Sequence, residues 1–128
     1  MGLYFTHVMV GADDPAASIA FYDAIFATLD VPSQKMEDRA FYGEPGTGMF
    51  AVGRPRNGEA ATPANGGTIG FGAPDIATVN AWHAAGLANG GTCEGAPGRR
   101  DYGQPMYGAY LRDPVGNKLC CFTMNVEG

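Results

Sequence analysis

Histidine and cysteine can act as catalytic groups and as metal ligands, and both are scarce in this chain. The 128 residues include two histidines and three cysteines. His7 stands in an apolar segment, where it could serve as a metal ligand, a general base near neutral pH or a hydrogen-bonding partner for a substrate. The structural alternative is a histidine in a cavity wall that bonds to a neighbouring tyrosine. His83 falls within an expected helix, where packing against a sheet is the favoured interpretation.

The cysteines show no spacing typical of a disulfide framework. Their number is odd, and Cys120 and Cys121 are adjacent, so in a strand their side chains point to opposite faces. We therefore expect reduced thiols and a cytoplasmic protein. No sequence feature supplies a cation or a helix N-terminus that would activate Cys120 as a nucleophile. We interpret Cys120 as a small apolar wall residue and Cys121 as core.

A segment near the N-terminus recurs 61 residues later. Residues 6–14 read Thr-His-Val-Met-Val-Gly-Ala-Asp-Asp, and residues 67–75 read Gly-Thr-Ile-Gly-Phe-Gly-Ala-Pro-Asp. Each copy predicts a short strand, a Gly-Ala turn, an aspartate cap and a helix. A half of about 60 residues would be marginal alone, because it buries too little surface. The chain is therefore expected to be one α+β domain of two mutually dependent modules.

Both modules repeat the same order of elements, β-α-β-β-β. Module one (residues 1–56) is expected to have strands over 4–10, 34–42 and 48–54, and a helix from Pro15 to about residue 29. Module two (residues 67–124) is expected to have strands over 67–72, 92–96, 105–112 and 118–124, and a helix over 76–89. A turn-rich linker over 57–66 separates them. Helical spacing predicts these buried faces: Ile19, Tyr22, Phe26 and Leu29; then Ile76, Val79, Trp82 or His83, and Leu87.

Alternation along the first strand of each module predicts which side chains face a ligand. Val8 and Val10 form one row, matched in module two by Ile69 and Phe71, and this row is expected to pack under the helices. His7 and Met9, matched by Thr68 and Gly70, then lie on the opposite face. Glycines there favour a cavity. Further lining residues are expected among the tyrosines and apolar residues of the later strands, and the predicted ligand-binding set is Met9, Met49, Thr68, Gly70, Tyr110, Cys120 and Phe122.

Three motifs together resemble the vicinal oxygen chelate superfamily, which includes glyoxalase I, bleomycin-resistance proteins and extradiol dioxygenases. They are His7-Val8 in the first strand, the helix motif 18–22 (Ser-Ile-Ala-Phe-Tyr) and the turn 113–117 (Asp-Pro-Val-Gly-Asn) before the last strand. Their order and spacing, with the repeat, cover nearly the whole chain. The resemblance implies paired modules whose mixed sheets curve around a cup-shaped site, with the helices on the outer face.

Metal-using members of that superfamily carry His and Glu ligands on matching strands of the two modules. Carried onto this sequence, those positions hold His7, Thr68, Ala51 and Cys120. Of these, His7 and Cys120 alone offer a metal-binding side chain, and a catalytic site typically needs about three protein ligands. We therefore expect no metal cofactor. A zinc site completed by Glu44, Glu59, His83 or a partner chain is the alternative kept open.

These observations predict a protein that binds a small apolar or amphipathic molecule in the cup, with His7 as the candidate catalytic or anchoring residue. Whether it is an enzyme stays open. One alternative implied by the resemblance is a metal-dependent lyase similar to glyoxalase I, and another is a drug-sequestering resistance protein, for which an acidic chain suits a cationic drug.

The composition also bears on partners. The net charge of −5 disfavours nucleic acid, which needs clustered Lys or Arg, and no apolar run is long enough for a membrane span. The resemblance and the modest size favour a homodimer.

Overall fold

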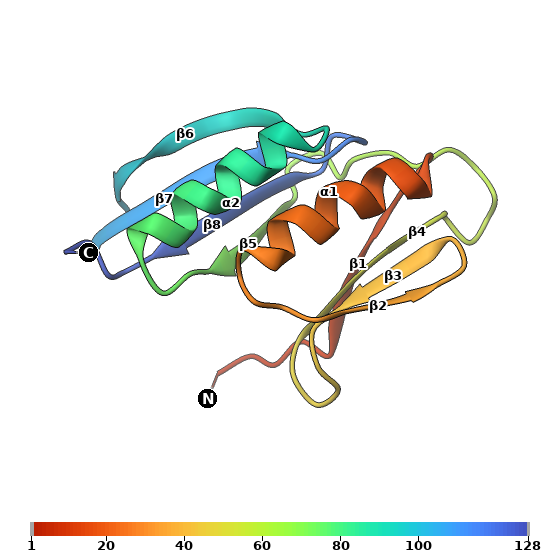
Figure 1. Ribbon diagram of the computed structural model, residues 1–128, viewed down its shortest axis with the longest axis horizontal. Coiled ribbons are helices and arrows are strands. Elements are labelled where there is room, and N and C mark those ends of the chain that lie inside the picture. Colours follow the sequence, from red (N-terminus) through yellow and green to blue (C-terminus); the bar gives the residue numbers. More distant parts are fainter. Residues whose placement is uncertain (1, 128) are drawn as a thin grey trace.

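The duplicated sequence folds into two similar units, each a helix packed on a four-stranded sheet (Figure 1). The computed structural model describes residues 2–127. Module one contains β1 (His7–Gly11), α1 (Pro15–Ala27), β2 (Ser33–Met36), β3 (Arg39–Tyr42) and β4 (Met49–Gly53). Module two contains β5 (Thr68–Gly72), α2 (Ile76–Ala88), β6 (Thr92–Asp101), β7 (Pro105–Arg112) and β8 (Lys118–Thr123). The predicted fold class is confirmed.

The two sheets have the same topology. Sheet one has the order β1-β4-β3-β2 and sheet two the order β5-β8-β7-β6, with the first pair of each parallel and the remaining pairs antiparallel. Met9 pairs with Ala51 in sheet one, and Gly70 pairs with Cys120 in sheet two. Ala51 and Cys120 therefore occupy equivalent positions, as the repeat predicts. In each sheet the first strand, β1 or β5, is an edge strand.

Both helices begin as the sequence predicts. The Asp14 carboxylate accepts a hydrogen bond from the backbone N–H of Ala17 at 3.2 Å, and Asp75 accepts one from Thr78 at 2.8 Å. These bonds satisfy backbone donors that have no partner within the first helical turn. Pro15 stands at the first position of α1, where its missing N–H leaves no donor unpaired.

Three boundaries differ from the sequence-based expectation. The segment 34–42 is not one strand but the hairpin β2–β3, which turns at Glu37 with a positive φ of 55°. β6 continues to Asp101, past residue 96, and includes a register shift between Cys93 and Gly95. β1 starts at His7, and the preceding residues 3–5 are exposed and apolar.

The expected buried face of α2 is wrong at its C-terminal end. Leu87 is 45% exposed, whereas Trp82 and His83 are both buried. Gly86 takes the inward position instead, and a Cβ there would meet the Leu111 side chain of β7. The absence of a side chain at Gly86 lets α2 approach the sheet closely, which turns Leu87 outward.

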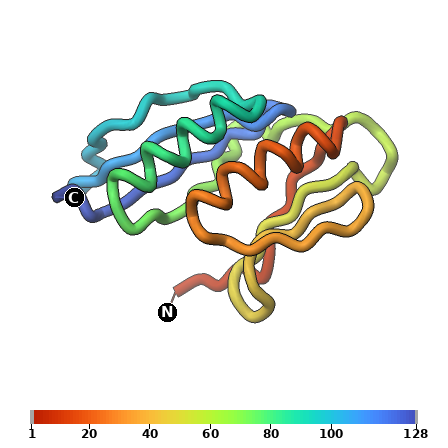
Figure 2. Tube along the Cα trace, viewed as in Figure 1, coloured from red at the N-terminus to blue at the C-terminus, as the bar shows by residue number. Residues whose placement is uncertain are grey.

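The modules share one hydrophobic core. α1 and α2 lie side by side on the same side of the two sheets (Figures 1 and 2). Phe71 of module two makes an edge-on contact with Phe26 of module one, with ring centroids 5.1 Å apart. The ring centroid of Phe50, also in module one, lies 5.8 Å from that of Phe71. Neither module buries these aromatic faces alone, so the two halves depend on each other.

A buried polar contact also joins the modules. The Tyr22 hydroxyl of α1 donates to Asp113 Oδ2 at 2.5 Å, and Asp113 Oδ1 accepts three backbone N–H groups of residues 115–117. Asp113 thereby fixes the turn before β8, and Tyr22 fixes that turn to module one. Burial, followed by the Asp113 charge, raises the pKa of Tyr22, so the phenol remains a donor.

Within residues 2–127, no helix is long and apolar enough to cross a membrane.

Candidate functional site

Side chains of β1 and β5 alternate as the sequence predicts. Val10 belongs to the core under the helices, with Val8, Ile69 and Phe71 packed against it. His7 and Met9 are exposed on the opposite side of sheet one. We call the side of each sheet that α1 and α2 do not cover its open face.

The predicted site residues all lie on the open faces or at their edge, but the structure divides them into groups. Met49 and Gly70 line one cavity, and Met9 and Thr68 line another of about 280 Å³. A third group, on sheet two, is built around Tyr110, Phe122 and Cys120.

His7 is separate from these groups. Its Nδ1 lies 3.0 Å from the hydroxyl oxygen of Thr6, so its partner is the adjacent threonine rather than a tyrosine. The imidazole is exposed, and no carboxylate or thiol holds it in a fixed orientation by a hydrogen bond within residues 2–127.

The third group is an aromatic cluster. Tyr110 and Phe122 are in edge-on contact with centroids 5.7 Å apart, and the Tyr102 hydroxyl lies 3.4 Å from that of Tyr110. This hydrogen bond, followed by burial, raises the pKa of Tyr110 to about 12. Arg100 and Lys118 lie over the Tyr110 ring at 5.9 and 5.1 Å from its centroid. Tyr102 and Tyr110 are on the open face, and Tyr107 packs against the core, whereas Tyr42 is buried but lines the cavity described next.

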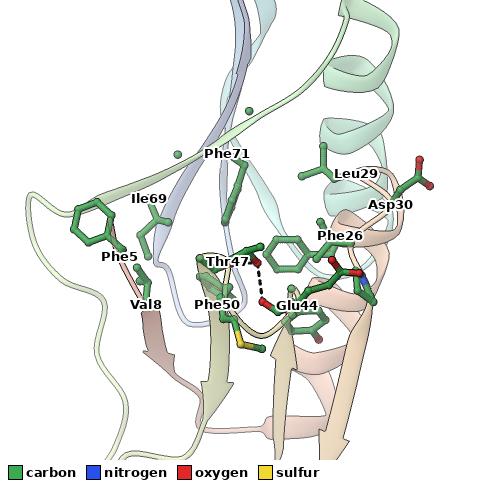
Figure 3. Close-up of a pocket in the computed structure, with 18 residues that line it drawn as sticks. Phe5, Val8, Phe26, Leu29, Asp30, Glu44, Thr47, Phe50, Ile69 and Phe71 are labelled. Carbon is green, nitrogen blue, oxygen red and sulfur yellow. Dashed lines mark hydrogen bonds between the residues drawn. The ribbon is translucent and has the colours of Figure 1, made fainter. Parts of the chain in front are cut away.

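A larger cavity, of about 560 Å³, lies where the two modules meet (Figure 3). We call it the inter-module cavity. β1 and β4 of module one, β5 of module two and the C-terminal end of α1 contribute to it. Figure 3 shows the Phe71 ring between Ile69 on one side and Phe26 on the other. The apolar wall of the cavity includes Phe5, Val8, Phe26, Leu29, Phe50, Ile69 and Phe71.

The edge strand β5 contributes backbone as well as side chains to the cavity. The backbone N–H of Ala73 donates to the carbonyl of Phe122 in β8. Since successive residues of a strand direct their backbone groups to opposite sides, those of Gly70 and Gly72 point away from β8, toward the free edge. Both glycines line the cavity. Unpaired backbone donors and acceptors are therefore available beside an apolar wall.

Apart from Tyr42 of β3, the polar side chains of the cavity belong to segments that border it. Asp30 follows α1, and Glu44 and Thr47 belong to the loop between β3 and β4. The Thr47 hydroxyl donates to the Glu44 carbonyl at 2.7 Å, which closes this loop. The Asp30 carboxylate points away from the apolar wall (Figure 3). The residues that line the cavity include two carboxylates and no Lys, Arg or His.

Sequence reasoning missed most of this wall. It assigned Val8, Ile69 and Phe71 to the core beneath the helices, and the structure confirms that row but leaves space along it where the modules meet. Alternation of Ile69 and Phe71 with Gly70 and Gly72 is the available signal, but in the sequence it indicates a cavity on the opposite face.

The four positions that carry a metal in the resembling superfamily do not fit a metal here. Ala51 has no side-chain donor atom, and Thr68 offers only a hydroxyl oxygen. Burial raises the pKa of the Cys120 thiol, which opposes the thiolate that a metal requires. Among residues 2–127, no three His, Cys, Asp or Glu side chains are grouped so as to hold a metal ion.

Comparisons with known proteins agree on one family. The family model described as Glyoxalase/Bleomycin resistance protein/Dioxygenase superfamily matches residues 4–121. A glyoxalase/bleomycin resistance protein from Albidiferax ferrireducens T118 is 48% identical, covers 93% of this chain and 98% of its own, and superposes with a TM-score of 0.86. A search among curated proteins finds no match.

More distant structures show the same fold. A lactoylglutathione lyase from Agrobacterium tumefaciens is 23% identical, covers 95% of this chain and 94% of its own, and has a TM-score of 0.65. A glyoxalase/bleomycin resistance protein/dioxygenase family enzyme from Burkholderia phytofirmans PsJN is 18% identical, with 95% and 99% coverage and a TM-score of 0.69.

Proposed function

Because this chain belongs to the glyoxalase/bleomycin resistance protein/dioxygenase superfamily, we propose that it binds a small apolar or amphipathic molecule in the inter-module cavity, without a divalent metal centre. The observation that carries this proposal is the cavity itself. Its volume of about 560 Å³ lies within the range of small-molecule sites, and aromatic and aliphatic side chains dominate its wall.

The ligand should combine an apolar body with a small polar group. Phe50, Ile69 and Phe71 offer the apolar contacts. The free edge of β5 offers backbone hydrogen bonds at Gly70 and Gly72, which orient a ligand without adding charge. The lining residues include no histidine or cysteine, and the Asp30 carboxylate points away from the apolar wall, so the contacts offered to a ligand are mainly apolar.

Two neighbouring substitutions on β5 test where the ligand binds. Ile69→Trp places a larger side chain inside the cavity and fills part of it. Thr68→Trp places the same ring on the open face, one residue away. We expect Ile69→Trp to weaken binding of an uncharged naphthalene-type fluorophore at least about tenfold, because its site is filled, and Thr68→Trp to leave binding near the wild-type value. Fluorescence titration measures both. Weakening by Thr68→Trp alone would place the ligand on the open face and contradict the proposal.

The absence of a metal centre has its own test. Purified protein should contain substoichiometric zinc, manganese and nickel after dialysis, and titration with each ion should give no saturable binding that His7→Ala removes. One metal bound per chain, lost in His7→Ala and in Cys120→Ala, would sink this part of the proposal.

Sequestration of cationic amphiphiles is a second candidate function, favoured by the charges around the cavity. Asp30 and Glu44 are its charged lining residues, and both are acidic. A cationic fluorophore should therefore bind more tightly than an anionic one of the same ring system, and Glu44→Gln should reduce that preference. Equal affinities for the two dyes would count against this function.

We also propose a homodimer. Tyr4 is 97% exposed and Leu3 is 86% exposed, and both stand just before β1, which has one edge that no strand within residues 2–127 pairs with. Exposed apolar side chains beside unpaired strand edges are typical of surfaces that a second chain covers.

A further inference from the structure

A thiol and an imidazole meet at the far edge of sheet two, away from the inter-module cavity. His83 Nε2 lies 3.2 Å from Cys93 Sγ, within hydrogen-bonding distance. His83 belongs to α2 and Cys93 to β6, so tertiary packing and not sequence proximity brings the two together. Neither residue lines the inter-module cavity.

The two partners differ in exposure. His83 is only 7% exposed, because α2 packs on sheet two at this point. Cys93 pairs with Leu111, which faces α2, so the cysteine lies on the helix side of the sheet. β6 is the edge strand of sheet two, and Cys93 is therefore exposed to solvent. Packing therefore holds the His83 imidazole in place, while the Cys93 sulfur is accessible to a reagent.

The imidazole has a nitrogen lone pair free to accept a proton. Burial lowers the pKa of His83, so the ring is neutral at neutral pH. In the tautomer that carries its proton on Nδ1, Nε2 accepts the S–H of Cys93. Among the residues described on the adjoining strands, Glu94 and Arg112 pair with each other at 2.8 Å. Burial is the cause of the His83 shift, with no contribution from these charges.

We propose that His83 and Cys93 form a thiol–imidazole pair that makes Cys93 the site of exchange with small-molecule disulfides. As the Cys93 sulfur attacks one sulfur of the disulfide, Nε2 takes the thiol proton. A Cys93–sulfur bond forms, the original S–S bond breaks, and the departing thiolate takes the proton from the imidazolium. One disulfide replaces another, so no outside oxidant is needed.

The other thiols provide an internal comparison. Cys120 and Cys121 are buried, and burial raises the pKa of both thiols, that of Cys121 to about 12. Inert buried thiols leave Cys93 as the expected single point of reaction in the folded protein.

The test is the rate of reaction of the folded protein with dithiodipyridine, followed by release of the coloured thione. We expect one adduct per chain, located at Cys93 by mass spectrometry and absent in Cys93→Ser. We expect His83→Gln to react at least about tenfold more slowly at neutral pH, a bound set below the roughly hundredfold effect at which general-base catalysis typically begins. That ratio should shrink toward about pH 9, where ordinary thiols ionise without help. A merely structural role for His83 would give a ratio that does not depend on pH.

Several results would overturn the proposal. These are an adduct on Cys120 or Cys121 in the folded protein, or equal rates for wild type and His83→Gln at neutral pH. If His83→Gln does not fold, the wild-type rate is compared with that of a peptide of residues 90–96. At neutral pH the folded protein should react at least about tenfold faster than the peptide, and equal rates would overturn the proposal.

Discussion

Tyr22 and His83 occupy the same position in the two modules, 61 residues apart, yet their polar groups have different hydrogen-bonding partners. The Tyr22 hydroxyl crosses between modules to Asp113, whereas the His83 imidazole stays within module two and contacts Cys93. The repeat indicates that both residues face the sheet, and the structure confirms it. It cannot indicate their partners, because Asp113 and Cys93 lie outside the part of the repeat that the sequence preserves.

Removal of the Tyr22 hydroxyl should be costly. In Tyr22→Phe the buried Asp113 Oδ2 keeps only the side-chain amide of Asn117, at 2.9 Å. We expect the free energy of unfolding to fall by about 1.5–3 kcal/mol, the range for hydrogen bonds to charged groups. Urea unfolding measures the change. Tyr42→Phe is the control, because its partner Asp23 is partly exposed, and it should cost less than about 1 kcal/mol.

The lowered pKa of His83 should make the stability of the protein depend on pH. Its pKa is lowered in the folded protein, whereas an unfolded chain has a histidine pKa near about 6.5. As the pH falls below that value, the unfolded state binds a proton that the folded state does not bind. The free energy of unfolding should therefore decrease with falling pH, and His83→Gln should lessen that decrease. Identical pH profiles for the two proteins would contradict this assignment.

At the scale of elements, local sequence signals specify the helix starts well and the inward faces less well. Asp14, Pro15 and Asp75 predict both N-termini because capping depends on residues next to one another in the chain. Leu87 was predicted to be buried because periodicity favours a large apolar residue over a glycine. The close approach of Leu111 from β7 decides that position, and helical spacing does not reveal it.

Gly86→Ala tests whether the close approach of Leu111 to α2 requires a glycine at this position. Alanine gains about 1 kcal/mol of helix propensity over glycine. The added Cβ would, however, stand 2.4 Å from Leu111 Cδ1, in a fully buried part of the core. We expect a net loss of roughly 1 kcal/mol in the free energy of unfolding, because overpacking costs about 1–3 kcal/mol. Leu87→Ala, at the exposed neighbour, should change stability less. An increase in stability with Gly86→Ala would contradict this explanation, because it would mean that Leu111 moves to make room for the added Cβ.

At the scale of the whole molecule, the repeat predicts two modules but not how they pack. Pairing β1 with β5 would have closed the edge of each sheet. The structure instead joins the modules through α1, α2 and the aromatic rings between them. The space left beside β5 becomes the inter-module cavity, and the residues expected in one cup are divided among several sites. Relative placement of two modules depends on contacts distant in sequence, which alternation within a strand cannot encode.

The proposed homodimer gives a prediction at this scale. Sedimentation velocity should show a dimer at micromolar concentrations, and the double variant Leu3→Ser, Tyr4→Ser should shift the equilibrium toward monomer, because these exposed apolar side chains lose their gain from burial. The pair Thr62→Ser, Thr78→Ser is a mild control elsewhere on the molecule. A wild-type monomer at all concentrations would contradict the proposal.

The most direct test of the central proposal is a crystal structure of the protein with the tightest-binding uncharged fluorophore from the titrations. We expect the ligand between Phe50, Ile69 and Phe71, with a hydrogen bond to the free edge of β5. A ligand bound on the open face, among Tyr110, Phe122 and Cys120, with the inter-module cavity empty, would contradict it.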